Sequence, residues 1–416
     1  MNLLSRIVDL PRGRVARGTV ATTAVMAVRV CALAVQMLLA ARLLQPESFA
    51  HYVAVGVLAV LLGGLSTFGT QLLVLRDVAR GEGIESFAIG LGTWRWLALP
   101  LFGIYLLACQ SMGLLGGAWL LILGVGVAEF FLQPLLQLIA AVLQGRGAVP
   151  LGQGWLVAPL AARALLILGL TLVSPPEPLA WLGGVHLVAS LAPVVLMLRF
   201  GGVGVPSHRQ WRRLLGKEWG AAAGFALLGV TANAQAELDK LLAVRLLPLG
   251  AAGLYAAASR VLGAVVLPVM AMLVSAMPRL FGKVEWDRRL VSALATASLA
   301  YACLAGGAVW VLAPCVGWLL GPGYAGVEEV LRTLLWALPA QSLRLVALNV
   351  LMTKGSPATR VGVEAFGMAC LVSVALGMRA AGYGLAAAVV LAEWATMLVA
   401  VGVIALQVGR RRWDAR

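Results

Sequence analysis

The sequence predicts an all-helical, polytopic membrane protein of about twelve transmembrane helices, arranged as two six-helix lobes around a central cavity. Of its 416 residues, 61% are hydrophobic and only 12% are charged, whereas about a quarter of the residues in a soluble domain are charged. Apolar segments long enough to cross a bilayer, which takes about 20 residues, fill almost the whole chain. The loops between them are short, so we expect no large domain outside the membrane.

Twelve apolar segments carry this prediction, and their limits are good to a few residues. They fall at about 19–44, 50–75, 87–108, 117–143, 149–173, 178–199, 219–246, 251–277, 290–316, 328–352, 359–379 and 383–408. The first follows a basic stretch but is longer than the apolar region of a secretory signal. We therefore expect it to remain as the first span.

The longest predicted loop on the basic side, Gly201–Glu218, divides these segments six and six. This division predicts an N-terminal lobe over 1–205, a linker over 206–218 and a C-terminal lobe over 219–416. The linker mixes tryptophan and leucine with basic residues. That pattern fits either a short helix lying on an anionic membrane surface or a plain solvated connection.

The basic residues are unevenly distributed between the two sides of the predicted bundle. With the N-terminus in the cytoplasm, most of the 32 lysines and arginines fall in the tails and loops on that side, and Arg42, Arg245 and Arg379 lie opposite. This asymmetry follows the positive-inside rule. It predicts a multi-pass protein of the inner (cytoplasmic) membrane with both termini cytoplasmic, and it accounts for the net charge of +15 without a nucleic-acid partner.

Motifs for several kinds of chemistry are missing from the sequence. It contains no GxxxxGK[ST] phosphate loop, no HExxH, no GxSxG and no calcium-binding loop, which are the local signatures of several enzyme and metal-binding classes. The five cysteines lack metal-site spacing. We therefore predict a protein that is not an enzyme and that has no cofactor and no metal site.

Seven cations nevertheless fall inside apolar segments, where a charge costs roughly 2.5–3.5 kcal/mol on insertion scales. They are Arg29, Arg95, Arg163, Lys240, Arg260, Arg332 and Arg344. At about 1.5 Å of rise per helical residue, Arg29, Arg95 and Arg260 approach the middle of the membrane. Each of these three could line a cavity or form a structural ion pair, whereas Arg332 and Arg344 are close enough to span ends to reach the interface.

Fewer acidic residues accompany these cations. They are Glu129, Glu237, Asp239, Glu364 and Glu393. The excess of positive charge favours an anionic ligand. The fourth segment also places Glu129, Gln133, Gln137 and Gln144 on one narrow helical stripe, which lipid would reject. The glutamines could hydrogen-bond either neighbouring helices or hydroxyl groups of a ligand.

The seventh segment is the most polar. Glu237 and Lys240 are three residues apart and could pair on one helix face. Asp239 and Arg260 lie at similar distances from the turn near Pro248. We therefore predict that Arg260 contacts Asp239 or Glu237, and that Glu129, Glu237, Asp239 and Lys240 act in ion pairing or in coupling transport to an ion.

Several stretches carry a resemblance to a known family, in the same order along the whole chain. They are ARLLQPESFAHYVAVGVL (41–58), STFGTQLLVLRDVARG (66–81), the run 237–281 that begins ELDKLLAV, GPGYAG (321–326) and AAGYGLAAAVVLAEW (380–394). Together they resemble Wzx-type polysaccharide (oligosaccharide) flippases of the MOP (MATE-like) superfamily. Asp239, Lys240, Tyr255 and Arg260 match the family's D-K…Y…R run, whereas Arg29 and Arg95 rest on depth and charge alone.

The resemblance implies transport by alternating access. The substrate would be an undecaprenyl-diphosphate-linked oligosaccharide, moved from the inner to the outer leaflet for a surface polysaccharide such as lipopolysaccharide. Its partners would be membrane lipids, a polysaccharide polymerase and the chain-length machinery. We expect Arg29, Arg95, Arg260, Gln133, Gln137 and Tyr255 to bind the diphosphate and the sugars. The alternative is a MATE-like antiporter of small cations, which would favour an acidic cavity.

Overall fold

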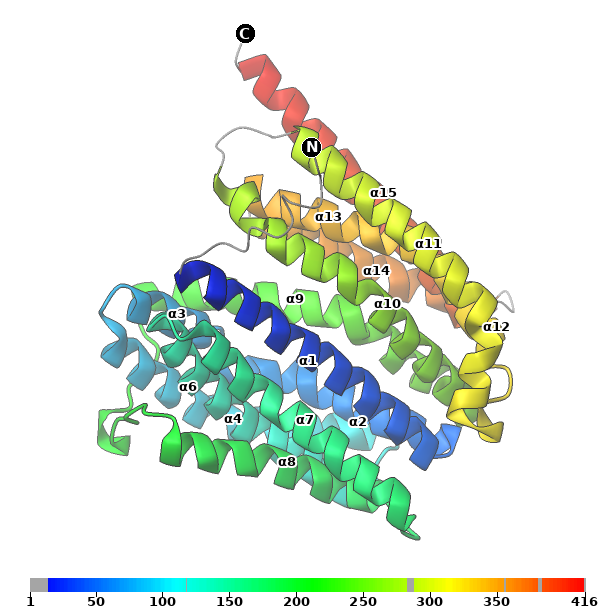
Figure 1. The fold of residues 1–416 in the computed structure, drawn as a ribbon, viewed down its shortest axis with the longest axis horizontal. Helices are drawn as coiled ribbons and strands as arrows, with labels where there is room; N and C mark the ends of the chain where they lie inside the picture. The colour runs from blue at the N-terminus through cyan, green and yellow to red at the C-terminus, as the bar shows by residue number, and fades with distance from the viewer. Residues whose placement is uncertain (1–13, 117, 283–287, 355–356, 381–383, 415–416) are drawn as a thin grey trace, which may run out of the picture. The chain divides into compact units, whose positions relative to one another are not determined.

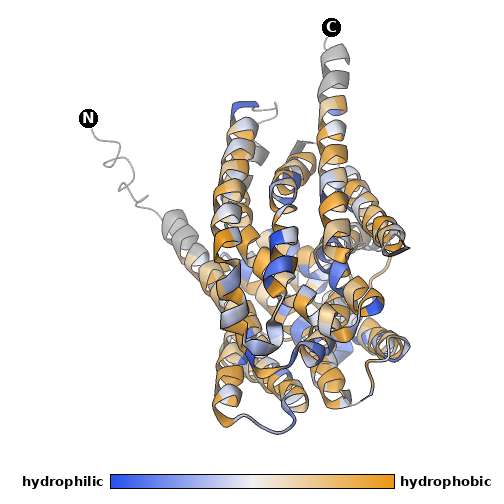
Figure 2. Ribbon diagram, turned by 90° about the vertical axis from the view of Figure 1, so that its right-hand side faces the viewer, coloured by the Kyte–Doolittle hydropathy of each residue, from blue (hydrophilic) through white to orange (hydrophobic). Residues whose placement is uncertain are grey.

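The computed structural model describes residues 14–116, 118–282, 288–354, 357–380 and 384–414, and every regular element in these ranges is helical (Figure 1). Most residues of the helices are hydrophobic (Figure 2). By length and composition, ten helices could each cross a membrane, and α12 with α13 forms an eleventh candidate, bent by 46°. The prediction of an all-helical polytopic membrane fold is confirmed.

Contacts divide the chain into two compact units. Unit 1 contains Met1–Ala40 and Leu58–Ala226, and unit 2 contains Ala41–Val57 and Leu227–Arg416. The first half of the chain forms α1 (Arg14–Leu43), α2 (Pro46–Gly63), η2 (Gly64–Thr67), α3 (Thr70–Ala79), α4 (Gly83–Ser111), α5 (Trp119–Val127), η3 (Ala128–Leu132), α6 (Gln133–Gly145), α7 (Val149–Val173), α8 (Pro178–Phe200) and η4 (His208–Gln210).

The second half forms α9 (Lys217–Leu246), α10 (Leu249–Gly282), α11 (Arg288–Leu320), η5 (Pro322–Tyr324), α12 (Val327–Leu335), α13 (Leu338–Lys354), α14 (Pro357–Ala380) and α15 (Leu385–Asp414). Each expected apolar segment corresponds to one of these helices or to a short run of them. The seventh segment is α9, which is 30 residues long but too polar to count among the apolar spans.

The second expected segment is not continuous. Phe68 and Gly69 both adopt left-handed backbone conformations, with φ of 47° and 75°, and they separate η2 from α3. Glycine tolerates this conformation, whereas it is costly for phenylalanine. A Cβ at residue 69 would also collide with the backbone of α9 at Ala222, so the break allows α3 and the first turns of α9 to approach closely.

The linker between α8 and α9 forms neither a helix on the membrane nor a free connection. Apart from the short 3-10 turn η4, it is non-helical and lies along α4. The Arg212 amide donates to the Ala88 carbonyl at 3.3 Å, and the rings of Trp211 and Trp94 are 6.0 Å apart. The expected interfacial helix is therefore wrong. Most linker residues are exposed, as in a solvated connection, but Trp211 and Arg212 hold the linker to α4.

In unit 2, the turn between α1 and α2 packs on η5. The Tyr324 hydroxyl donates to the Leu44 carbonyl at 3.2 Å, and Phe49 meets the Tyr324 ring edge-on. A Cβ at Gly253 would collide with the Pro46 carbonyl. Burial raises the pKa of Tyr324, so its phenol stays protonated and keeps donating. These contacts explain why Ala41–Val57 groups with the second unit.

Candidate functional site

The polar site of unit 1 is centred on one ion pair. Arg163 Nη2 of α7 lies 2.9 Å from Glu129 Oε1 and donates to Ser190 Oγ of α8, also at 2.9 Å. Arg163 and Ser190 are both buried. Arg163, one of the seven intramembrane cations, is thus a buried partner of Glu129.

A local change of helix type accompanies this pair. Glu129 lies in η3, a π-helical turn between α5 and α6, and such turns occur frequently at functional sites. The indole of Trp94 in α4 donates to the Phe130 carbonyl at 3.0 Å, which satisfies a backbone acceptor within the turn. The sequence carries no clear signal for a π turn.

The glutamine stripe continues from this turn along α6. Gln133 and Gln137 are both partly buried, so they face protein rather than open lipid over much of their surface. Within the described residues, Gln133 Oε1 and Arg163 Nε are buried without a hydrogen-bond partner. Unit 1 therefore contains an unused acceptor and an unused donor near one membrane-embedded ion pair.

The polar site of unit 2 lies between α9 and α10. Arg260 Nη1 is 2.9 Å from Glu237 Oε1, so the predicted contact of Arg260 with this helix is confirmed at Glu237. Lys240 Nζ lies 3.4 Å from Glu237 Oε2 and 3.1 Å from Asp239 Oδ1. The Tyr255 hydroxyl donates to Asp239 Oδ2 at 2.6 Å. Two cations and two carboxylates thus balance one another.

Two further ion pairs in unit 2 were not predicted. Arg344 Nε and Nη2 donate to the two oxygens of Glu393, at 2.7 and 3.1 Å, and both residues are buried. Arg344 therefore does not extend to the interface. Glu364 accepts from Thr231 Oγ1 at 2.6 Å and from Arg360 Nε at 3.1 Å.

Three intramembrane cations have no acidic partner in the part of the chain that the structure describes. Arg332 stacks on Trp310 at 4.7 Å and donates to its carbonyl at 3.4 Å. Arg29 lies at the middle of α1, and its side chain is exposed. Arg95 of α4 is exposed as well. Arg29 and Arg95 belong to unit 1, whereas Arg260 belongs to unit 2.

The position of the linker contradicts the predicted depth of Arg95 near the middle of the membrane. Irregular backbone is not exposed to the hydrocarbon core and occurs at membrane depth only where protein covers it or water reaches it. The non-helical residues Trp211–Arg213 follow α4 as far as Trp96, over which Arg213 stacks at 3.9 Å. Arg95 therefore lies beside water or lipid headgroups rather than in the dry centre of the membrane.

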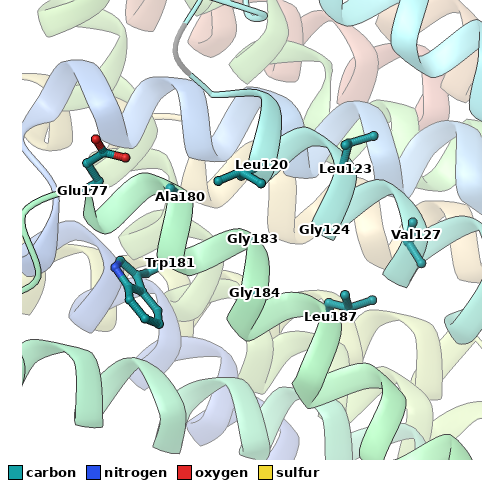
Figure 3. Close-up of a pocket in the computed structure, with 10 residues that line it drawn as sticks. All are labelled: Leu120, Leu123, Gly124, Val127, Glu177, Ala180, Trp181, Gly183, Gly184 and Leu187. Carbon is teal, nitrogen blue, oxygen red and sulfur yellow. The ribbon is translucent and has the colours of Figure 1, made fainter.

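A separate hollow lies in unit 1 between α5 and α8. Gly124 and Gly183 allow the two helices to touch, and leucine, valine and tryptophan side chains line the hollow, with Glu177 at one end (Figure 3). Its lining has no cation and almost no polar group. It does not resemble a site for a charged headgroup.

The sequence matches no protein-family model and no curated protein, but solved structures resemble it over nearly their whole length. A MATE family transporter of the MOP superfamily in an inward-facing conformation matches with a TM-score of 0.72 at 15% identity, over 93% of this chain and 95% of that one. The outward-facing conformation of a MATE family transporter matches at 0.61 and 16% identity, over 96% and 95%.

A third structure is a MOP superfamily transporter from Pyrococcus furiosus, described as having a binding pocket of reverse polarity that suggests a different function. It matches at 0.62 and 14% identity, over 96% of this chain and 95% of that one. Identities this low establish the architecture and not the substrate. The chain therefore has the fold of the MOP superfamily transporters.

Proposed function

We propose that this protein is a flippase for a lipid-linked oligosaccharide. It would move an undecaprenyl-diphosphate-linked unit from the inner to the outer leaflet of the cytoplasmic membrane during synthesis of a surface polysaccharide. Both inward-facing and outward-facing MATE family structures share its fold, which supports transport by alternating access.

The distribution of ion pairs carries the proposal. Apart from Glu328 and Glu329 at the start of segment 328–352, the acidic residues in the predicted spans are paired: Glu129, Glu237, Asp239, Glu364 and Glu393. Arg29 and Arg95 have no acidic partner among the described residues. Since an unpaired charge in the middle of a span is costly, Arg29 favours a ligand that brings negative charge, as a diphosphate does.

Most of the predicted site residues have a part in this proposal. Arg29 binds the diphosphate, because a guanidinium offers a planar fork of donors to phosphate oxygens. Gln133 and Gln137 hydrogen-bond sugar hydroxyls. Arg260 is held by Glu237 but has an unused Nε donor, and Tyr255 orients Asp239. Glu129 or Asp239 carries the coupled proton.

The alternative is a MATE-like antiporter of cationic small molecules. Such a protein needs a carboxylate that is free to meet the cation, and the five carboxylates named above, which lie within the spans, already have cationic partners. The reverse polarity described for the Pyrococcus furiosus transporter indicates that this fold accommodates pockets of different charge. The charge balance therefore favours the flippase.

Reconstitution into proteoliposomes with a fluorescent undecaprenyl-diphosphate oligosaccharide tests the proposal. We expect wild-type protein to expose the glycan on the opposite leaflet and Arg29→Ala to lower the rate at least tenfold. Arg332→Ala is the matched control, because Arg332 is an intramembrane cation already stacked on Trp310. Full activity of Arg29→Ala, or transport of cationic dyes without glycan transport, would contradict the proposal.

A further inference from the structure

Two arginines without acidic partners among the described residues lie where the linker meets α4: Arg95 of α4 and Arg213 of the linker. Arg213 stacks on Trp96 at 3.9 Å, and both side chains are exposed. Arg95 is the helical neighbour of Trp96 and is exposed too. Among the described residues neither arginine forms an ion pair, whereas the adjacent Arg212 is neutralised by Glu85.

Helical geometry places Arg95 on the linker side of α4. A Cβ at Gly92 would meet the Arg212 backbone, so Gly92 faces the linker. At about 100° per residue, Arg95 points roughly 60° away from Gly92, at the edge of the same face. The Ala88 carbonyl accepts from the Arg212 amide at 3.3 Å. Arg95 therefore borders the surface on which the linker lies, one residue before the Trp96 ring that Arg213 covers.

The position of Arg213 is built into the fold rather than left to a mobile loop. The backbone carbonyl of Arg212 lies against Gly92, where any Cβ would collide with it. Trp211 packs on Trp94, and its indole donates to the Pro206 carbonyl at 3.0 Å. The stacking on Trp96 then fixes the guanidinium, which lowers the entropy cost of ligand binding.

We infer that Arg95 and Arg213 form a binding site for the phosphate group of a lipid headgroup. Two guanidinium groups with unused donors match phosphate oxygens. Tryptophans at a membrane surface lie at headgroup level, and Trp96 is accompanied by the exposed Leu99, which can contact the acyl chain. The ligand chemistry is a phosphodiester or a diphosphate attached to a lipid.

Two lipids carry this chemistry. A bulk anionic phospholipid would make the site a regulatory or stabilising contact that is independent of transport. A polyprenyl diphosphate would make it a loading site; this second version rests on the proposed function. Binding to detergent-solubilised protein separates the two without requiring transport.

The experiment uses native mass spectrometry of the full chain with phosphatidylglycerol, phosphatidylcholine or undecaprenyl diphosphate. We expect Arg95→Gln and Arg213→Gln each to weaken binding of phosphatidylglycerol or of undecaprenyl diphosphate about tenfold. Trp96→Leu should weaken it less, because it removes only the support of Arg213. Arg209→Gln is the matched control, since Arg209 is an exposed linker arginine without a described contact to α4.

Each outcome decides a different point. Loss of phosphatidylglycerol binding identifies bulk lipid as the ligand, and loss confined to the diphosphate identifies the loading site. Unchanged binding in both arginine variants overturns the inference, as does an equal loss in Arg209→Gln, which would indicate general attraction to positive charge. Binding that persists in a protein without flippase activity refutes the proposed function and leaves this site intact.

Discussion

Arg344 and Glu393 join α13 to α15 through two hydrogen bonds of 2.7 and 3.1 Å. The side chains are only 5% and 10% exposed, so neither charge has water as an alternative partner. A planar guanidinium that meets both oxygens of one carboxylate is the geometry that Arg favours over Lys. This pair therefore fixes the register between two helices of unit 2.

Removing one partner of this pair should destabilise the protein strongly. We expect Glu393→Gln to cost about 3–5 kcal/mol, because it leaves a buried guanidinium without a counter-charge. Thermal unfolding in detergent measures the effect. The double variant Arg344→Met with Glu393→Leu should recover much of the loss, and a double variant as unstable as the single one would contradict this explanation.

The linker contact predicts a difference between two glycines of α4. Gly92→Ala should push the linker away, because the added Cβ would collide with the Arg212 carbonyl, whereas Gly103 has nothing within 4 Å of its Cβ position. Trypsin cleaves after arginine, so linker cleavage at Arg209, Arg212 and Arg213 should accelerate in Gly92→Ala only. Equal cleavage in Gly103→Ala would show that the linker is not held by this contact.

Comparing the depths of residues on consecutive helices predicted one tertiary contact correctly. The same comparison could not predict contacts between helices that are distant in the sequence. Arg260 and Glu237 lie on consecutive helices joined by a short turn, so their depths could be compared directly. Arg344 and Glu393 lie on helices that are not consecutive, and a single sequence does not reveal which distant helices pack together. The break at Phe68 and Gly69 had a local signal in the glycine-rich run 63–69. It was missed because the segment was defined by hydrophobicity alone, which does not change at the break.

The two polar sites should differ in their tolerance of a lost carboxylate. Glu129 is the only described acidic partner of Arg163, so Glu129→Gln should cost about 3–5 kcal/mol by exposing an uncompensated buried charge. Asp239→Asn should cost less, because Lys240 keeps Glu237 at 3.4 Å and the amide oxygen can still accept from Tyr255. Parallel melting curves test this order, and a greater loss in Asp239→Asn would refute it.

Replacing Arg29 should change the melting temperature in the opposite direction from replacing Arg344. No acidic side chain in the described residues stabilises its charge, and a cation within a span costs roughly 2.5–3.5 kcal/mol on insertion scales. Arg29→Leu should therefore melt at a higher temperature than the wild type while losing glycan transport, as expected where function retains a destabilising residue. Arg344→Leu provides the contrast, because it should lower the melting temperature. A lower melting temperature for Arg29→Leu would mean that Arg29 has a structural partner in the protein. It would contradict the proposal that Arg29 is left unpaired in order to bind an anionic substrate.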